Sequence, residues 1–180
     1  MEFLECVKNR RSIRKYKAEP VPKALLEKIV SVAAYAPSWK NVQATRYIAI
    51  LDSELRKDLA DNCTSGFAWN QKIVNDAPAV ILVTTITGRS GFERDGSFST
   101  SKGAHWESFD AGIATQTLCL AAHNEGLGTV VLGVFDEEKI IKRVNIPEGQ
   151  KLSALVAIGF PDETPDAPKR KETENLLTIL

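Results

Sequence analysis

Hydrophobic residues recur along the chain with two periods. Spacings of three and four residues, typical of one face of a helix, alternate with short apolar runs typical of buried strands. The first pattern predicts helices over residues 2–8, 22–36, 53–61, 105–124 and 137–144. The second predicts strands over residues 46–51, 79–85, 129–134 and 152–158. Residues 62–75 are expected to form a packed irregular segment that leads into a further short helix.

Several residues mark where these elements begin and end. Pro22 suits the first turn of a helix, and Asp52 and Asp136 suit N-caps. Gly126 suits the left-handed position that closes a helix. Residues 79–85 are apolar on both faces, which predicts a strand inside a sheet covered by helices.

Composition narrows the class of protein. The 180 residues fit one domain over residues 1–180, and 23 basic side chains balance 23 acidic ones. This balance argues against a nucleic-acid or anionic-membrane partner, since both require a basic excess. Three widely spaced cysteines predict no disulfide framework and favour a reducing, cytoplasmic location. Neither a secretory signal nor a membrane-spanning segment is expected.

Positive charge is concentrated near the N-terminus. Arg10, Arg11, Arg14 and Lys15 lie within eight residues, with Ser12 among them. Arginine matches phosphate oxygens two at a time, so we interpret the segment as an anion clamp. The simpler alternative is a solvated charge run after a helix.

Other kinds of chemistry have little support. The sequence contains no P-loop, no Gly-x-Gly-x-x-Gly motif and no Gly-x-Ser-x-Gly elbow. Cys119 and His123 are one helical turn apart, but such a pair is more often packing than a metal site. A group of polar residues at the start of the long helix, namely His105, Glu107 and Asp110, is expected to be a solvated helix start.

Two segments outside the regular pattern have distinctive compositions. Residues 86–104 are rich in Gly, Ser and Thr, which predicts a mobile excursion. Residues 161–180 form a polar linker with an apolar end at residues 176–180. Such an end favours docking on a partner, most simply a second copy of the chain.

Four motifs in this order resemble the nitroreductase family over almost the whole chain. They are residues 10–14 (RRSIR), residues 36–43 (APSWKNVQ), residues 110–133 with Gly126-Leu127-Gly128, and residues 169–171 (KRK). The resemblance implies an α+β fold with a mixed central sheet flanked by helices. It also implies an intertwined homodimer with FMN in two interface clefts, residues 86–104 covering each cleft, and residues 161–180 reaching the other subunit.

The resemblance also assigns the cofactor contacts. Cations would hold the FMN phosphate or the pyrimidine edge of the ring, with Ser12 beside them; these are Arg10, Arg11, Arg14, Lys169 and Lys171. Asn41 and Asn70 would contact the flavin or its ribityl chain. Pro37 and Ser38 would approach it from the partner subunit, and Trp39 is also expected among the cofactor-binding residues. The backbone N–H groups of Leu132 and Gly133 would face flavin N5 and O4.

By this resemblance the protein takes hydride from NADH or NADPH and reduces a nitroaromatic, quinone or similar acceptor in a ping-pong cycle. FMN carries the chemistry, and no protein side chain acts as acid, base or nucleophile. The chain departs from the family pattern at Trp39, at Ala44-Thr45 and at Ile73, which bears on the acceptor. Two alternatives stay open: a protein that stores or senses FMN without efficient turnover, and a nucleic-acid-binding module.

Overall fold

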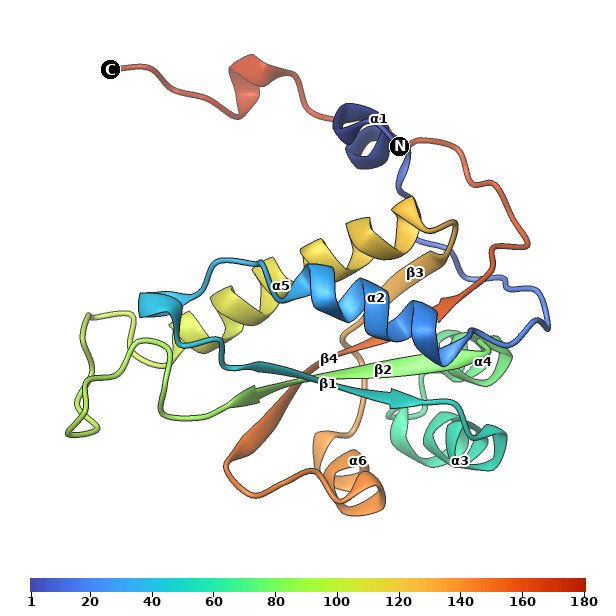
Figure 1. The fold of residues 1–180 in the computed structure, drawn as a ribbon, viewed down its shortest axis with the longest axis horizontal. Helices are drawn as coiled ribbons and strands as arrows, with labels where there is room; N and C mark the ends of the chain where they lie inside the picture. Colours follow the sequence, from blue (N-terminus) through green and yellow to red (C-terminus); the bar gives the residue numbers. More distant parts are fainter.

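A four-stranded antiparallel sheet organises the chain. The computed structural model describes all residues, 1–180. The strands pair in the order β1-β2-β4-β3 (Figure 1). Their bounds are β1 Thr45–Ile50, β2 Ala79–Ile86, β3 Gly128–Leu132 and β4 Gln150–Gly159. All four predicted strands are present, but β3 ends at Leu132, two residues before its predicted end.

The predicted α+β fold is confirmed, and the sheet is mixed in one place only. The three strand pairings are antiparallel, and a single isolated bridge between Ser12 and Thr129 is parallel. This bridge lies on the outer edge of β3. The segment after the first helix therefore joins the sheet without forming a strand of its own.

Five of the six helices cover the sheet in two layers, and α1 lies outside them, next to α5. The bounds of the six helices are α1 Phe3–Asn9, α2 Lys23–Ala33, α3 Ser53–Cys63, α4 Ala68–Asp76, α5 His105–Asn124 and α6 Glu137–Val144. Two 3-10 turns, Trp39–Asn41 and Thr173–Asn175, complete the secondary structure. Helices α2 and α5 cover one face, and α3, α4 and α6 cover the other (Figure 1). None of the helices combines the length and apolar character required to cross a membrane.

The alternation of side chains along β2 explains the two layers. Ile81 and Val83 pack in the cluster formed with α2 and α5, whereas Val80 and Leu82 pack in the cluster formed with α3, α4 and α6. Successive side chains of a strand point to opposite faces. A strand that is apolar at every position therefore needs helices on both sides, as its composition predicted.

The predicted end signals act as expected. Asp52 Oδ1 accepts a hydrogen bond from the N–H of Leu55 at 2.8 Å, and Asp136 Oδ1 accepts one from the N–H of Lys139 at 3.1 Å. These bonds satisfy N–H groups that the first turns of α3 and α6 leave free. Gly126, with φ +80°, follows the end of α5 in the left-handed conformation.

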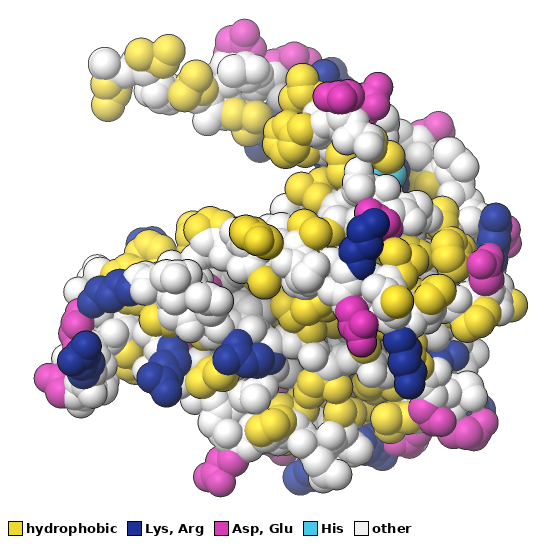
Figure 2. Space-filling view, in the orientation of Figure 1, with side chains coloured by type: hydrophobic (Ala, Val, Ile, Leu, Met, Phe, Trp, Pro, Cys, Tyr) yellow, Lys and Arg dark blue, Asp and Glu magenta, His cyan; other side chains and the backbone are white.

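The last 20 residues form an arm that leaves the sheet. Figure 1 shows this arm (residues 161–180) passing close to α1 and ending away from the body. A hollow separates it from the body in Figure 2, with apolar side chains along the arm. Four of them are exposed, Leu176 70%, Leu177 56%, Ile179 86% and Leu180 115%. A single chain thus leaves the apolar end of the arm uncovered.

Candidate functional site

The cationic segment is fixed to the edge of β3. The N–H of Ile13 donates to the carbonyl oxygen of Thr129 at 3.0 Å, and the Ile13 side chain is buried. Its packing requires glycine at position 128, because a Cβ there would lie 2.6 Å from Ile13 Cγ1. Ser12 and Arg14 flank Ile13 in the chain, and Arg14 is exposed.

The cations of this segment form no ion pairs with carboxylates. Arg11 Nη1 donates to the carbonyl oxygens of Lys8 and Arg10, so this guanidinium closes the end of α1. Arg14 Nη1 donates to the carbonyl oxygen of Ser12 at 3.2 Å. Glu163 accepts hydrogen bonds from the backbone N–H groups of Arg14 and Lys15, not from their charged ends. The segment therefore keeps positive charge available for an anion.

His123 lies close to these cations near the end of α5. Burial, together with the charges of Arg10 and Arg11, lowers the pKa of His123. Its Nε2 atom is buried without a hydrogen-bond partner. Burial raises the pKa of the Cys119 thiol, which favours the protonated form. No group of three or more His, Cys, Asp or Glu side chains could hold a metal ion.

The chain just beyond β3 is fixed by hydrogen bonds to α4 and to the end of α3, and the space next to Gly133 is free. Asn70 is 5% exposed, and its Nδ2 donates to the carbonyl oxygen of Val134 at 2.9 Å. The N–H of Asp136 donates to the carbonyl oxygen of Cys63 at 2.7 Å. A Cβ on Gly133 would meet no atom within 4 Å. A flat molecule can therefore approach the backbone at Gly133 closely.

The polar loop of residues 36–43 has a strained backbone. Lys40, Asn41 and Gln43 adopt left-handed conformations, with φ of 44°, 55° and 48°. Ser38 Oγ accepts a hydrogen bond from the N–H of Gln43 at 3.0 Å. The N–H of Trp39 donates to Asp110 Oδ2 at 2.9 Å. Left-handed non-glycine residues are uncommon and tend to occur at functional sites.

One chain does not bring all of the predicted site residues together. Residues 37–41 contact α5 at Asp110. Arg10 and Arg11 instead lie near His123, which is also a residue of α5. These two positions are 13 residues apart, or about 20 Å along a helix. Figure 1 places the two groups at opposite ends of α5. A site that uses both groups therefore needs a second chain.

The predicted tail lysines lie on the arm. Lys169 and Lys171 line a shallow surface hollow of about 320 Å³ with Arg170, Glu172 and Asn175. The arm begins beside the cationic segment. Tyr16 and Pro161 form an isolated antiparallel β-bridge, and Glu163 accepts a hydrogen bond from the backbone N–H of Arg14. Only the first residues of the arm are tied to the segment in this way.

A second hollow lies between α2, β1 and the loop of residues 36–43. This cavity has a volume of about 450 Å³ and a mostly apolar lining, with Ser38 and Asp110 among its polar residues. Tyr47 also lines it, and the Tyr47 hydroxyl is buried without a hydrogen-bond partner. Burial, together with the nearby Cys119, raises the pKa of Tyr47 to about 12.

The expectation of a solvated start for α5 is wrong for Glu107 and Asp110, whereas His105 is exposed as expected. Glu107 is 2% exposed and Asp110 is 3% exposed. Glu107 Oε2 lies 2.5 Å from Lys151 Nζ, and Glu107 Oε1 accepts a hydrogen bond from the N–H of Gly88 at 2.7 Å. Residues 86–104 fold back over this end of α5 and bury both carboxylates. The sequence signal for these buried carboxylates was the pair Glu107 and Asp110, three residues apart and so on one face of the helix. Acidic residues are also common in exposed first turns, so the pair alone did not indicate burial.

Comparison with known proteins gives consistent results. The family model described as "Nitroreductase family" matches residues 7–69 and 65–160. A putative NADH dehydrogenase/NAD(P)H nitroreductase of Methanothermobacter thermautotrophicus is 33% identical, covering 92% of this chain and 80% of that protein. The FMN reductase [NAD(P)H] of Bacillus subtilis is 30% identical, covering 89% of this chain and 66% of that protein. The crystal structure of a nitroreductase family protein from Clostridium novyi NT superposes with a TM-score of 0.78 at 30% identity, covering 93% of this chain and 90% of that one.

Proposed function

This chain belongs to the nitroreductase family, and we propose that it is an FMN-dependent oxidoreductase. It takes hydride from NADH or NADPH and reduces a nitroaromatic, quinone or similar acceptor in a ping-pong cycle. The names of its relatives support the nicotinamide donor and the flavin, since they include an NAD(P)H nitroreductase and an FMN reductase.

The observation that carries the proposal is a cluster of unpaired cations beside β3, the strand that leads to an open glycine. Ser12 pairs with Thr129 at the start of β3, and Gly133 follows its end. Thr129 and Gly133 are four residue steps apart along the chain, or about 13 Å. The residues present fit FMN in both respects, because a phosphate needs cations and a flat ring needs uncrowded backbone.

FMN, when bound, would supply a two-electron carrier that accepts hydride from the nicotinamide and passes it to the acceptor. The protein would bind and orient this cofactor. Arg10 and Arg14 would compensate negative charge, together with Lys169 and Lys171 of the arm. Asn70 would keep Val134 in place, so that the N–H groups of Leu132 and Gly133 stay directed at the ring.

We further propose that the working protein is a homodimer. Pro37, Ser38, Trp39 and Asn41 would then complete the site of the partner subunit, since one chain keeps them apart from its own cationic segment. The apolar end of the arm would dock on the partner. Residues 86–104 would cover the cleft and move during turnover. A cytoplasmic location belongs to the same proposal and is supported by three unpaired, buried cysteines.

A visible absorption spectrum of the purified protein tests the proposal directly. We expect a flavin spectrum, release of about one FMN per chain on heating, bleaching by NADH or NADPH without oxygen, and recovery of colour with a quinone. A colourless protein that takes up no added FMN would exclude the proposed function. Bound FMN that NADH and NADPH leave oxidised would instead favour a protein that stores or senses FMN.

A further inference from the structure

Asp110 is a buried carboxylate that joins two separate segments. Its Oδ2 atom accepts a hydrogen bond from the N–H of Trp39 at 2.9 Å and another from Ser90 Oγ at 2.6 Å. Asp110 is 3% exposed and Ser90 is fully buried. Trp39 begins the 3-10 turn of the loop, and Ser90 belongs to residues 86–104. A single side chain of α5 therefore holds both segments from below.

The charge of Asp110 has no counterion. Glu107, one helical turn earlier, is compensated by Lys151, whereas Asp110 forms no ion pair. Burying a carboxylate costs free energy unless strong hydrogen bonds replace water. Hydrogen bonds to a charged acceptor are about twice as strong as neutral ones. The two hydrogen bonds therefore attach Trp39 and Ser90 firmly to Asp110. The buried charge lowers the stability of this part of the core relative to apolar side chains in the same place.

The loop held by Asp110 combines a strained backbone with a few short-range hydrogen bonds of its own. Three of its residues, Lys40, Asn41 and Gln43, have left-handed backbones, a conformation that costs free energy for each of them. Within the loop, three hydrogen bonds oppose this strain: the N–H of Asn41 donates to the carbonyl oxygen of Ser38 at 3.0 Å, that of Val42 to the carbonyl oxygen of Trp39 at 2.8 Å, and that of Gln43 to Ser38 Oγ at 3.0 Å. The bond from the N–H of Trp39 to Asp110 fixes the start of the turn.

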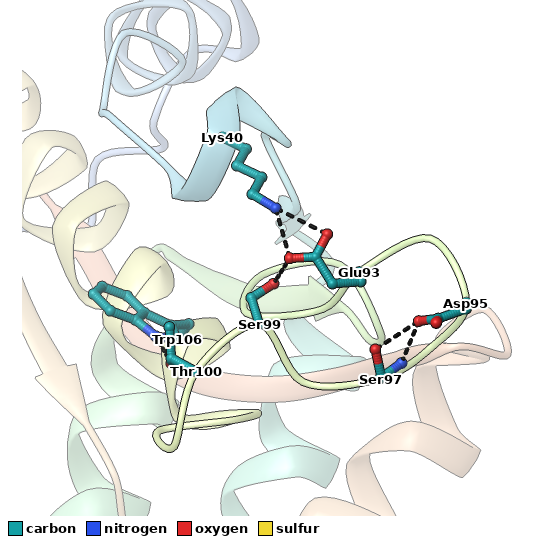
Figure 3. A network of polar contacts seen from close by, with 7 residues as sticks. All are labelled: Lys40, Glu93, Asp95, Ser97, Ser99, Thr100 and Trp106. Atoms are coloured by element: carbon teal, nitrogen blue, oxygen red, sulfur yellow. Dashed lines mark hydrogen bonds and ion pairs between the residues drawn. The ribbon is translucent and has the colours of Figure 1, made fainter.

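The other contacts between the two segments lie near the surface. Figure 3 shows Lys40 reaching from the loop to Glu93, with Nζ–Oε distances of 2.8 and 3.1 Å. Both side chains are about half exposed, 56% and 46%. Such pairs contribute little on their own. Trp39 also packs on Trp106 of α5, with ring centroids 4.8 Å apart. Asp110 is therefore the buried residue that connects the loop of residues 36–43 to residues 86–104.

We propose that Asp110 is a positioning residue, which holds residues 37–41 in the shape that meets the flavin of the partner subunit and, through Ser90, couples this loop to the covering segment of residues 86–104. The proposal rests on the proposed function for the flavin contact. The hydrogen bonds of Asp110 to Trp39 and Ser90 are formed within one chain and need neither flavin nor a partner subunit.

Substitution of Asp110 tests the first half of the proposal. The close indole rings of Trp39 and Trp106 should give a paired band in the far-ultraviolet circular dichroism spectrum, which a Trp39→Phe variant assigns. Asp110→Ala should lose this band without flavin and should bind FMN roughly tenfold more weakly. Asp110→Asn should restore much of both properties, because an amide oxygen accepts the same N–H, although more weakly than a charged carboxylate. An alanine variant with the normal band and normal FMN affinity would overturn the proposal.

Substitution of Ser90 tests the second half without disturbing Trp39. Ser90→Ala should keep the paired band and the FMN affinity, but trypsin should cut residues 86–104 several-fold faster, at Arg89, Arg94 or Lys102. The KM for the acceptor should change more than kcat. Unchanged cleavage would show that Asp110 does not couple the two segments. The circular dichroism spectrum and the trypsin cleavage can both be measured without flavin. If the proposed function were wrong, the wild-type protein would bind no FMN, and this result is distinct from the outcome of either test.

Discussion

The backbone of Gly128 packs against the side chain of Ile13, and any Cβ at position 128 would lie 2.6 Å from Ile13 Cγ1. This contact brings the cationic segment onto the edge of β3. Without it, the N–H of Ile13 could not reach the carbonyl oxygen of Thr129. The position of the proposed phosphate-binding cations therefore depends on a glycine that bears no charge.

Gly128→Ala is the first prediction that follows. We expect a loss of about 1–3 kcal/mol in the free energy of unfolding, because the new methyl group overpacks a buried contact. In an Ile13→Ala background the same change should cost less, since Ile13→Ala removes Cγ1 and Cγ2, two of the three atoms that a Cβ at position 128 would crowd. Urea denaturation of the two single variants and the double variant measures this coupling. Strictly additive effects would contradict the close contact.

Arg14→Ala should weaken FMN binding. One charge-assisted contact contributes about 1.5–3 kcal/mol, which corresponds to a roughly 10- to 150-fold higher Kd. Titration of apoprotein with FMN, followed by flavin fluorescence, gives this constant. Lys17→Ala is a matched control, because Lys17 is exposed just beyond the segment and its side chain forms no ion pair. Equal affinities for the two variants would argue against the clamp.

Gly133→Val should prevent normal FMN binding and leave the fold intact. The free space around the Cβ position lets the side chain fit without a clash in the chain itself. The same side chain would fill the space that the ring needs, and Gly133→Ala should show an intermediate effect. Flavin content and Tm, measured together, separate binding from stability. Normal flavin content in the valine variant would remove the assignment of this backbone to the ring.

Much of the fold could be predicted from the sequence because the signals are local. The apolar run of β2, the caps at Asp52 and Asp136, and the glycine after α5 act within a few residues of where they stand. The antiparallel order of the strands is different in kind. It depends on pairings such as Val80 with Ala157, which are distant in sequence and leave no local signal.

The candidate site was predicted less completely. Its cations and the glycine at position 133 were found from local charge and from a family resemblance. Asp110 was missed because its burial depends on residues 86–104 folding back over α5 and on Trp39 arriving from another loop. A carboxylate near a helix start has the same local pattern whether it is solvated or buried. Only the packing of distant segments distinguishes the two cases.

Deletion of residues 176–180 should weaken the proposed dimer. The four exposed apolar side chains of this segment gain no cover within one chain, so we expect their burial to contribute to association. Sedimentation velocity over a range of concentrations should show dissociation at concentrations where the full chain stays dimeric. Thr178→Ala, which leaves the apolar residues in place, should behave like the full chain. A deletion variant with unchanged association would rule out docking of this segment.

Tyr47→Phe should make the protein more resistant to alkaline pH. The pKa of Tyr47 rises from 10.0 to about 12 in the folded chain, chiefly because burial disfavours the phenolate. The folded state therefore keeps a proton that the unfolded state releases, and the free energy of unfolding falls as pH rises from 10 to about 12. Burial raises the pKa of Tyr16 as well, so the variant should reduce this fall without abolishing it.

The same substitution should also act at neutral pH. The Tyr47 hydroxyl is buried without a partner, and an unsatisfied buried hydroxyl costs about 1–3 kcal/mol. Phenylalanine keeps the ring and removes that cost, so the variant should be more stable than the natural chain at pH 7. Urea midpoints at pH 7, 9.5 and 11 measure both effects. Tyr35→Phe, at a tyrosine that is 89% exposed, is the control and should follow the natural chain. A Tyr47→Phe variant less stable at pH 7 would mean that the hydroxyl has a partner, most simply in the second subunit.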